Sequence, residues 1–469
     1  MTEINGKTLI SWGVPQGPWF PAALAAARQA IADGLGDDAV RSAALACGPT
    51  KVEQLPLREF DALGFHVNAI PETLEEGANI FAVKAHMREL MRVPTVVAGA
   101  IMPDACPAGS APGTIPVGGV VAAKDAIHPG MHSADICCSV AVSVFGRDVD
   151  PTAILDAGMT LSHFGGGGRP RGGEIHPPER VLSAFDSNPF LKPIVGVAIE
   201  HFATQGDGNH FFFVGRLRST GEIALVTHHG SRAPGARLYK AGMEVAERHR
   251  RAVSPETAAH NAWIPAESDD GRAYWDALQI IREWTKANHF AIHDRVGRTL
   301  GRGLRAAKHR FWNEHNFVFR KSDGLFYHAK GATPAWRDFA ADTNGLTLIP
   351  LNMAEPILIV EGSDAPHALG FSPHGAGRNM SRTAYLKTNA GKSEAEMIAE
   401  QAPGIDVRYF CGVPDTSELP GAYKNAESVR RQIDHFGLAR VIEEIEPIGN
   451  IMAGDWQRDA PWRRKRAAR

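Results

Sequence analysis

Apolar positions recur along this chain with two different spacings, which predict helices and strands respectively. Amphipathic helical spacing covers 20–34, 72–92, 238–252 and 271–300, with further helical patterns near 381–402 and 425–437. Shorter runs rich in β-branched and aromatic residues indicate strands. They cover 95–101, 120–123, 141–145, 210–215, 223–229, 316–320, 346–351 and 356–362. The sequence shows neither a repeat nor a clear linker, so we expect an α+β fold with one large mixed body.

Composition narrows the class of protein. Of the 469 residues, 44% are apolar and 22% are charged, the profile of a globular protein. The net charge of −2 excludes a polycation, so contact with nucleic acid would need a local patch such as 462–466, a basic run that is more often a solvated tail. The five cysteines follow no disulfide framework, and neither a signal peptide nor a membrane span is evident. We therefore expect a cytoplasmic protein.

Residue types that bind metals gather where predicted strands begin or end. Asp135 and Cys138 precede one strand, His210 opens another, His228 lies near the end of a third, and His315 precedes a fourth. Taken singly, each has a plainer explanation as a buried structural cysteine or a hydrogen-bonded core histidine. Together, mixed aspartate, cysteine and histidine ligands indicate a transition metal such as Mn, Zn or Co.

Two further segments suggest phosphate chemistry. Arg232 follows His228 across a Gly-Ser turn, and an arginine fork suits phosphate. Near residue 374, a histidine in a glycine loop is followed by Arg378 and Arg382, where helical geometry after Gly377 would place both arginines on one face. The alternative is that His374 caps a helix and the arginines are solvated.

His289 and His293 have the spacing of a zinc-binding pair on a helix, but the residues between them are Phe-Ala-Ile. Without a glutamate between them to act as a general base, a helix-face pair that binds no metal is the favoured interpretation.

In their order along the chain, these segments resemble the RtcB family of RNA-splicing ligases. The matching motifs are MPD at 102–104, ADICC at 134–138, GDGNHF at 206–211, THHGSR at 227–232, EHNFV at 314–318, HGAGRNMSR at 374–382 and LPGAYKN at 419–425. The resemblance implies an RtcB-like catalytic domain over 95–453, a partly helical N-terminal extension over 1–94 and a basic C-terminal tail over 454–469. It also implies that the protein joins RNA 2′,3′-cyclic phosphate or 3′-phosphate ends to 5′-hydroxyl ends. The cofactors would be GTP and two Mn²⁺ ions, and no obligate protein partner is evident.

Carried over position by position, the resemblance implies a role for each site residue. The Mn²⁺ ligands would be Asp135, Cys138, His210, His228 and His315. His374 would be the nucleophile that becomes guanylylated, with Lys330 near the transferred phosphate and Arg232 and Arg382 on RNA phosphates. The nucleotide would contact Asn209, Asn316, Asn352, Met353, His374, Gly375, Ala376 and Gly377.

Several positions depart from the family's usual sequence. Where the family usually has DIGCG, this chain has DICCS at 135–139, so Cys137 replaces a glycine. Cys106 replaces the histidine of MPDVH, and PLNMA at 350–354 replaces PGSMG. Phe213 replaces an acidic residue, and Ala453 replaces a near-terminal lysine that contacts guanine. These changes leave open a metal-dependent phosphoesterase or a nucleotidyltransferase with altered nucleotide specificity. A non-catalytic RNA-binding relative is a third possibility, although binding alone needs no nucleophile such as His374.

Overall fold

The computed structural model describes residues 4–14, 16–48, 53–301, 309–340 and 344–458, and the chain divides into two units, 1–55 and 56–469. The first unit contains α1 (Gly6–Ser11), α2 (Phe20–Ala32) and α3 (Asp37–Ala46), which share a small apolar core. Asn5 begins α1 by accepting backbone hydrogen bonds from Lys7 and Thr8, the usual role of an asparagine N-cap. All the site residues predicted above belong to the second unit.

The division at residue 55 differs from the predicted domain boundary between 94 and 95. Helix α4 (Leu74–Leu90) belongs to the second unit, where it buries Ile80, Val83 and Met87. These residues form one apolar cluster with Val96 and Ile101 of strand β2 (Val96–Cys106). Because the apolar partner of a helix lies elsewhere in the chain, the helical pattern alone did not reveal this attachment.

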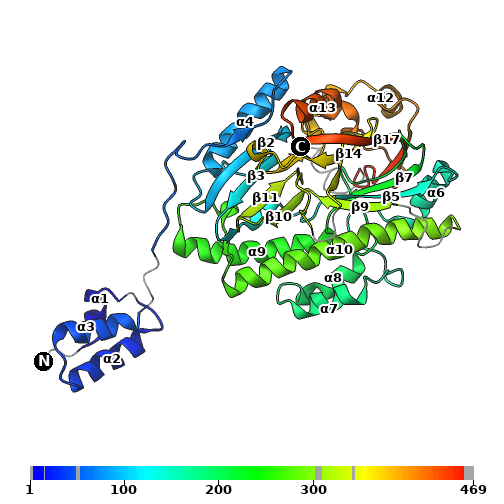
Figure 1. Ribbon diagram of the computed structural model, residues 1–469. Helices are drawn as coiled ribbons and strands as arrows, with labels where there is room; N and C mark the ends of the chain where they lie inside the picture. The colour runs from blue at the N-terminus through cyan, green and yellow to red at the C-terminus, as the bar shows by residue number, and fades with distance from the viewer. Residues whose placement is uncertain (1–3, 15, 49–52, 302–308, 341–343, 459–469) are drawn as a thin grey trace. The chain divides into compact units, whose positions relative to one another are not determined.

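Two large sheets form the framework of the second unit (Figure 1). The first has the order β1 (His66–Val67), β2, β3 (Val117–Ala123), β11 (Phe326–Lys330), β10 (Asn316–Arg320). The second has the order β13 (Leu346–Pro350), β14 (Ile357–Gly362), β17 (Ala439–Met452), β6 (Phe211–Leu217), β7 (Ile223–His229), β5 (Ser139–Gly146), β9 (His309–Glu314), and β16 (Asp406–Tyr409) pairs with β17. Two short pairs complete the strands: β4 (Ala126–Ile127) with β8 (Ile264–Pro265), and β12 (Ala332–Pro334) with β15 (Phe371–Pro373).

Helices pack outside these sheets. The two longest, α9 (Arg232–Val253) and α10 (Asp269–Thr299), run side by side beneath the strands in Figure 1. The others are α5 (Pro129–His132), α6 (Pro151–Leu161), α7 (Glu179–Ser187), α8 (Val195–Glu200), α11 (Arg382–Thr388), α12 (Glu394–Gln401) and α13 (Ala426–His435). The predicted α+β class is confirmed. Within the described ranges, no helix is both long enough and apolar enough to cross a membrane.

The helical pattern near 381–402 corresponds to two helices. The structure has α11, an interruption after Thr388, and a new start at Ser393, whose side chain forms a capping box with Glu396. A serine followed three residues later by glutamate is a helix-start signal, and here it takes precedence over the continuous apolar spacing.

Candidate active site

Strand ends bring the predicted metal ligands together. Cys138 immediately precedes β5, His210 immediately precedes β6, and His228 is the penultimate residue of β7. These three strands are neighbours in the eight-stranded sheet, in the order β6-β7-β5. His315 lies between β9 and β10, and its backbone N–H donates to the carbonyl of Cys138 at 2.8 Å. The ligands therefore meet at one edge of the sheet although they are far apart in sequence.

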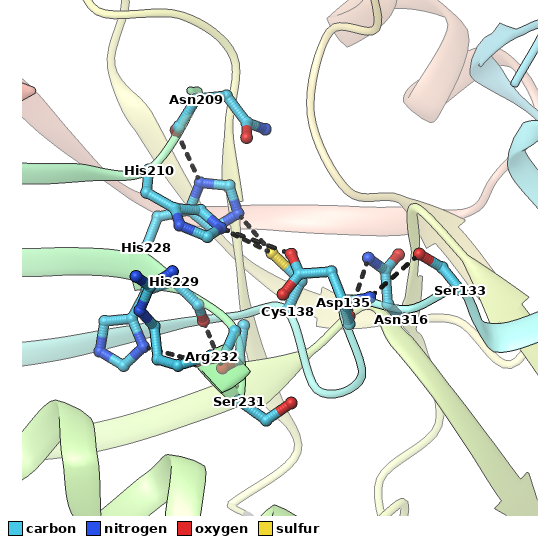
Figure 2. A network of polar contacts seen from close by, with 12 residues as sticks. Ser133, Asp135, Cys138, Asn209, His210, His228, His229, Ser231, Arg232 and Asn316 are labelled. Carbon is cyan, nitrogen blue, oxygen red and sulfur yellow. Dashed lines mark hydrogen bonds and ion pairs between the residues drawn. The ribbon is translucent and has the colours of Figure 1, made fainter. Parts of the chain in front are cut away.

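The five side chains form two overlapping clusters that share Cys138. One cluster joins Cys138, His228 and His315, and the other joins Asp135, Cys138 and His210, with candidate ligand atoms within 4.8 Å of one another in each. Figure 2 shows Asp135, Cys138, His210 and His228 pointing toward one another. A shared thiolate between two ligand sets is the arrangement needed to bridge two ions.

The distances between these atoms fit metal coordination. Cys138 Sγ lies 3.2 Å from His228 Nε2 and 3.7 Å from His210 Nε2. His228 Nε2 lies 3.3 Å from His315 Nε2, and His210 Nε2 lies 3.4 Å from an Asp135 carboxylate oxygen. Ligands bound at about 2.0–2.3 Å with tetrahedral angles are separated from one another by roughly 3.3–3.8 Å. The donor set therefore fits two transition-metal ions.

Local electrostatics put most of these groups in the form that binds a cation. Burial lowers the pKa of His228 to about 3 and that of His315 well below its usual value, so both imidazoles are neutral. Desolvation would raise the pKa of Asp135, but hydrogen bonds from His210 and Cys138, together with the nearby imidazoles, lower it to about 2. Burial and the neighbouring Asp135 raise the pKa of the Cys138 thiol, which a bound cation would reverse by deprotonating it.

A backbone carbonyl fixes the orientation of His228. The carbonyl oxygen of Asn209 lies 3.1 Å from His228 Nδ1 (Figure 2). Because a carbonyl can only accept, Nδ1 carries the proton and Nε2 keeps its lone pair toward the cluster. Outer hydrogen bonds of this kind orient histidine ligands in metal sites.

His374 has a corresponding partner in Asp104. Its Nδ1 lies 2.6 Å from Asp104 Oδ2, and the backbone N–H of His374 donates to the same oxygen at 3.0 Å. Since a carboxylate accepts, Nδ1 carries the proton and Nε2 keeps its lone pair. The ring centroids of His374 and His315 are 4.9 Å apart, so the candidate nucleophile lies beside the metal cluster.

The glycine loop after His374 permits this contact with Asp104. Gly377 has a φ of +74°, and a Cβ there would lie 2.0 Å from the backbone oxygen of Asp104. Lys424 holds the same strand by donating to the carbonyls of Pro103 and Ala105 at 2.7 and 2.8 Å. Close approach and positive φ together require glycine at position 377.

Two adjoining cavities open onto these residues. The inner cavity, of about 210 Å³, is lined by His374 to Gly377, by Asn352 and Met353, and by mostly apolar side chains. The outer cavity, of about 590 Å³, is lined by Asp135, His210 and Arg232. Asn209 and Arg382 line both cavities. The site can therefore hold one ligand against His374 and a second beside the metal cluster.

The arginines after His374 do not share one helical face, and both pair with a carboxylate although the Arg382 side chain is 52% exposed. Residues 373–381 are not helical, and α11 begins only at Arg382, so the predicted helical geometry after Gly377 was wrong. Arg378 and Arg382 instead converge on the buried carboxylate of Glu418. The alternative that His374 caps a helix is likewise excluded, because Ser381 is the N-cap of α11.

Arg232 is held in place at the first residue of α9. It has a φ of +55°, which non-glycine residues rarely adopt. Its guanidinium donates to the Gly165 carbonyl at 3.0 Å and to the Thr204 hydroxyl at 3.3 Å. Surrounding contacts therefore stabilise a strained backbone and place a cation on the wall of the outer cavity.

Two predicted contact residues lie beside the cavities rather than on their walls. Asn316 donates to the Asp135 carbonyl at 3.3 Å and accepts from the Gly331 N–H at 2.7 Å, so its amide links the Asp135 loop to the residue between β11 and β12. Lys330 ends β11 next to Gly331 and lines neither cavity. Burial lowers the pKa of Lys330.

The His289 and His293 pair on α10 belongs to neither metal-ligand cluster. His289 contacts the hydroxyls of Ser139 and Thr227 at 2.9 and 2.7 Å. His293 contacts Ser143 and the same threonine at 2.7 and 2.8 Å. Both imidazoles are buried and hydrogen-bonded to hydroxyl groups, which is a structural role.

Sequence reasoning assigned no role to Asp104, Glu418 or Asn450. Asp104 lies in the motif MPD and Glu418 lies next to the motif LPGAYKN. Their positions could therefore have marked them as candidate site residues. Asn450 lies on β17, whose sequence gave none, yet it lines the inner cavity and is 1% exposed.

Comparison with known proteins agrees with this geometry. The chain is 28% identical over 334 residues to the tRNA-splicing ligase RtcB of Aeropyrum pernix, covering 63% of this chain and 68% of that protein. It is 25% identical over 302 residues to the RNA-splicing ligase RtcB of Mycobacterium tuberculosis, covering 58% and 69%. Against the tRNA-splicing ligase RtcB of Pyrococcus abyssi, at 25% identity, the match spans 52% of this chain but only 30% of that longer protein.

The family model described as tRNA-splicing ligase RtcB matches residues 184–453, which is more than half of the chain. The matched segment includes His210, His228, His315 and His374, whereas Asp135 and Cys138 precede it and join the site only in the folded structure. The extent of this match shows that the chain belongs to the RtcB family.

Proposed function

We propose that this protein is a metal-dependent RNA ligase that acts through a covalent nucleotide on His374. The observation that carries the proposal is the Asp104–His374 pair, which leaves Nε2 as the nucleophile beside a cluster of metal ligands. The relatives named above are RNA- and tRNA-splicing ligases, and their activity supports the same function here.

In the first step, the Nε2 lone pair of His374 attacks the α-phosphorus of a nucleoside triphosphate. An N–P bond forms, the bond from the α-phosphorus to the bridging oxygen breaks, and pyrophosphate leaves with the electron pair. Asp104 keeps the proton on Nδ1 and balances the positive charge that develops on the imidazole. The family resemblance predicts GTP as the nucleotide.

In the second step, an oxygen of the RNA 3′-phosphate attacks the same α-phosphorus, and the N–P bond breaks. In the third, the 5′-hydroxyl oxygen of the other RNA end attacks the activated 3′-phosphorus. A phosphodiester forms, the nucleoside monophosphate leaves, and the hydroxyl proton is lost. A 2′,3′-cyclic phosphate end first needs hydrolysis to the 3′-phosphate.

Asp135, Cys138, His210, His228 and His315 would hold two divalent cations, and the resemblance predicts Mn²⁺. Bound there, such ions supply Lewis acidity that neutralises charge on phosphoryl oxygens. Asn209, Asn352, Met353 and Gly375 to Gly377 would contact the nucleotide from the walls of the inner cavity. Asn316 would act indirectly, by holding the Asp135 loop in position. Lys330 would contribute positive charge near the transferred phosphate.

RNA ends would enter through the outer cavity, where Arg232 and Arg382 provide positive charge next to the metal ligands. Arginine forks suit phosphate oxygens, and phosphate contacts position nucleic acid without reading its sequence.

A second candidate function is removal of the RNA 3′-terminal phosphate without joining. Phe213 and Ala453 motivate it, because both replace polar residues of the family's guanine pocket while the metal ligands remain. A cavity that held no nucleotide would leave only metal-assisted hydrolysis.

The direct test is to incubate the full chain with Mn²⁺ and two RNA strands, one with a 3′-phosphate and one with a 5′-hydroxyl. ATP and GTP are added in separate reactions. A nucleotide-dependent joined product that is lost in His374→Ala supports the ligase. Loss of the 3′-phosphate without joining would establish the phosphoesterase instead.

A further inference from the structure

The inner cavity contains a buried amide that the protein leaves unpaired. Asn450 is 1% exposed and lines the cavity, yet neither its Oδ1 nor its Nδ2 has a hydrogen-bond partner within the described part of the chain. A buried polar group without a partner costs about 1–3 kcal/mol, so such groups are rare without a reason. A ligand in the cavity could supply the partners that these two amide atoms lack.

Asn450 lies on β17 between strands β6 and β16. Asn450 pairs with Phe213 of β6 on one side and lies in register with Val407 of β16 on the other. Directly opposed residues of an antiparallel pair project from the same face, and both Phe213 and Asn450 line the cavity. The amide is therefore the polar group at this position, on a wall built otherwise from apolar side chains such as Ile357 and Met452.

The inner cavity also lacks a free carboxylate. Glu418 is the one acidic residue among the described residues that line it. Its oxygens accept from Arg378, Arg382 and the Tyr423 hydroxyl. Guanine presents two adjacent donors, N1–H and the 2-amine, which a carboxylate accepts together. With Glu418 occupied, that pairing is missing.

A single amide matches the edge of adenine better than that of guanine. Its Oδ1 can accept from the adenine 6-amine while its Nδ2 donates to a ring nitrogen, and the remaining C2–H suits an apolar wall. Against guanine, the amide could satisfy O6 and N1–H but would leave the 2-amine unpaired among apolar side chains. The same wall therefore discriminates against the 2-amine.

We infer that the inner cavity takes an adenine nucleotide, with Asn450 as the residue that reads the base. The inference rests on the proposed function, because it names the nucleotide that would react with His374. It also replaces GTP with ATP in the first step, while the bonds made and broken stay the same.

Binding to the full chain tests the inference without any need for turnover. Titration calorimetry of ATP, GTP and inosine triphosphate should show ATP bound about ten-fold or more tighter than GTP. Inosine triphosphate, which is guanosine triphosphate without the 2-amine, should recover much of that difference. GTP binding as tight as ATP, or tighter than inosine triphosphate, would overturn the inference.

Two substitutions refine the test. Asn450→Asp replaces the donor with a second acceptor and should move the ATP-to-GTP ratio toward GTP, whereas Asn450→Leu should bring it close to one. Near-ultraviolet circular dichroism checks that both variants fold, and the parent protein's own preference decides the question if either does not.

Labelling separates failure of this inference from failure of the proposed function. With nucleotides radiolabelled at the α-phosphate, GTP labelling His374 in preference to ATP would refute the adenine assignment and leave the ligase proposal standing. Preferential ATP binding without any label on His374 would keep Asn450 as the base reader and refute the covalent mechanism.

Discussion

Replacing Cys138 by serine tests the bridging role of its thiolate. Cys138 Sγ belongs to both ligand clusters and lies 3.2 Å from His228 Nε2. A serine hydroxyl stays protonated at neutral pH, whereas a cation readily deprotonates a thiol. We therefore expect Cys138→Ser to lose one ligand from each cluster at once.

The magnitude follows from the number of ligands. Structural sites with four ligands bind zinc with about 10–16 kcal/mol, so one ligand contributes roughly 3 kcal/mol, or about 100-fold in affinity. Because Cys138 belongs to both clusters, the affinity for each of the two ions should fall by about this factor. Equilibrium titration of Mn²⁺ into the metal-free protein, followed by calorimetry, measures both affinities.

Cys137→Gly is the matched control. Cys137 is adjacent and buried but belongs to neither cluster, and its φ of +56° is a conformation that glycine adopts without strain. Metal affinity should stay within about two-fold of the parent, since no ligand is removed. The assignment of the bridging ligand fails if Cys138→Ser binds both ions normally, or if the two variants lose affinity equally.

Three further changes probe other parts of the site. Asp104→Asn should lower nucleotide transfer to His374 by about 100-fold or more while metal binding is unchanged, because the amide no longer fixes the Nδ1–H tautomer; single-turnover labelling measures the rate. Arg382→Ala should weaken RNA binding and reduce the slope of log affinity against log salt by about one phosphate contact, in filter-binding titrations. Glu314→Leu should destabilise the second unit by about 3–5 kcal/mol in urea unfolding, because it leaves Arg282 as a buried charge without its partner; an effect below about 1 kcal/mol would show that the pair is dispensable.

Local pattern revealed most strands that carry the site, but not the long strand β17, which lies between β14 and β6 in the second sheet. β5, β6 and β7 are mostly apolar and buried, so their sequences stand out. β17 contains Glu443, Glu444 and Glu446 followed by Pro447, residues depleted in strands. Its pairing with β14 and β6 overrides that propensity.

Individual site residues show the same limit. The five candidate metal ligands could be identified because each lies at or near the end of a recognisable strand. The Asp104–His374 contact joins residues 270 positions apart, and no local pattern reports such a contact. Arg378 and Arg382 were found, but their shared partner Glu418 was not, so their geometry was predicted as helical when a buried carboxylate determines it.

The proposed mechanism requires that His374 becomes covalently attached to a nucleotide. The full chain, loaded with Mn²⁺ and incubated separately with ATP and GTP, should be digested at neutral pH and mapped by mass spectrometry. We expect one nucleoside monophosphate on the peptide that contains His374, labile to acid and absent from His374→Ala. A nucleotide attached to another residue, or RNA joined at the parental rate by His374→Ala, would contradict it.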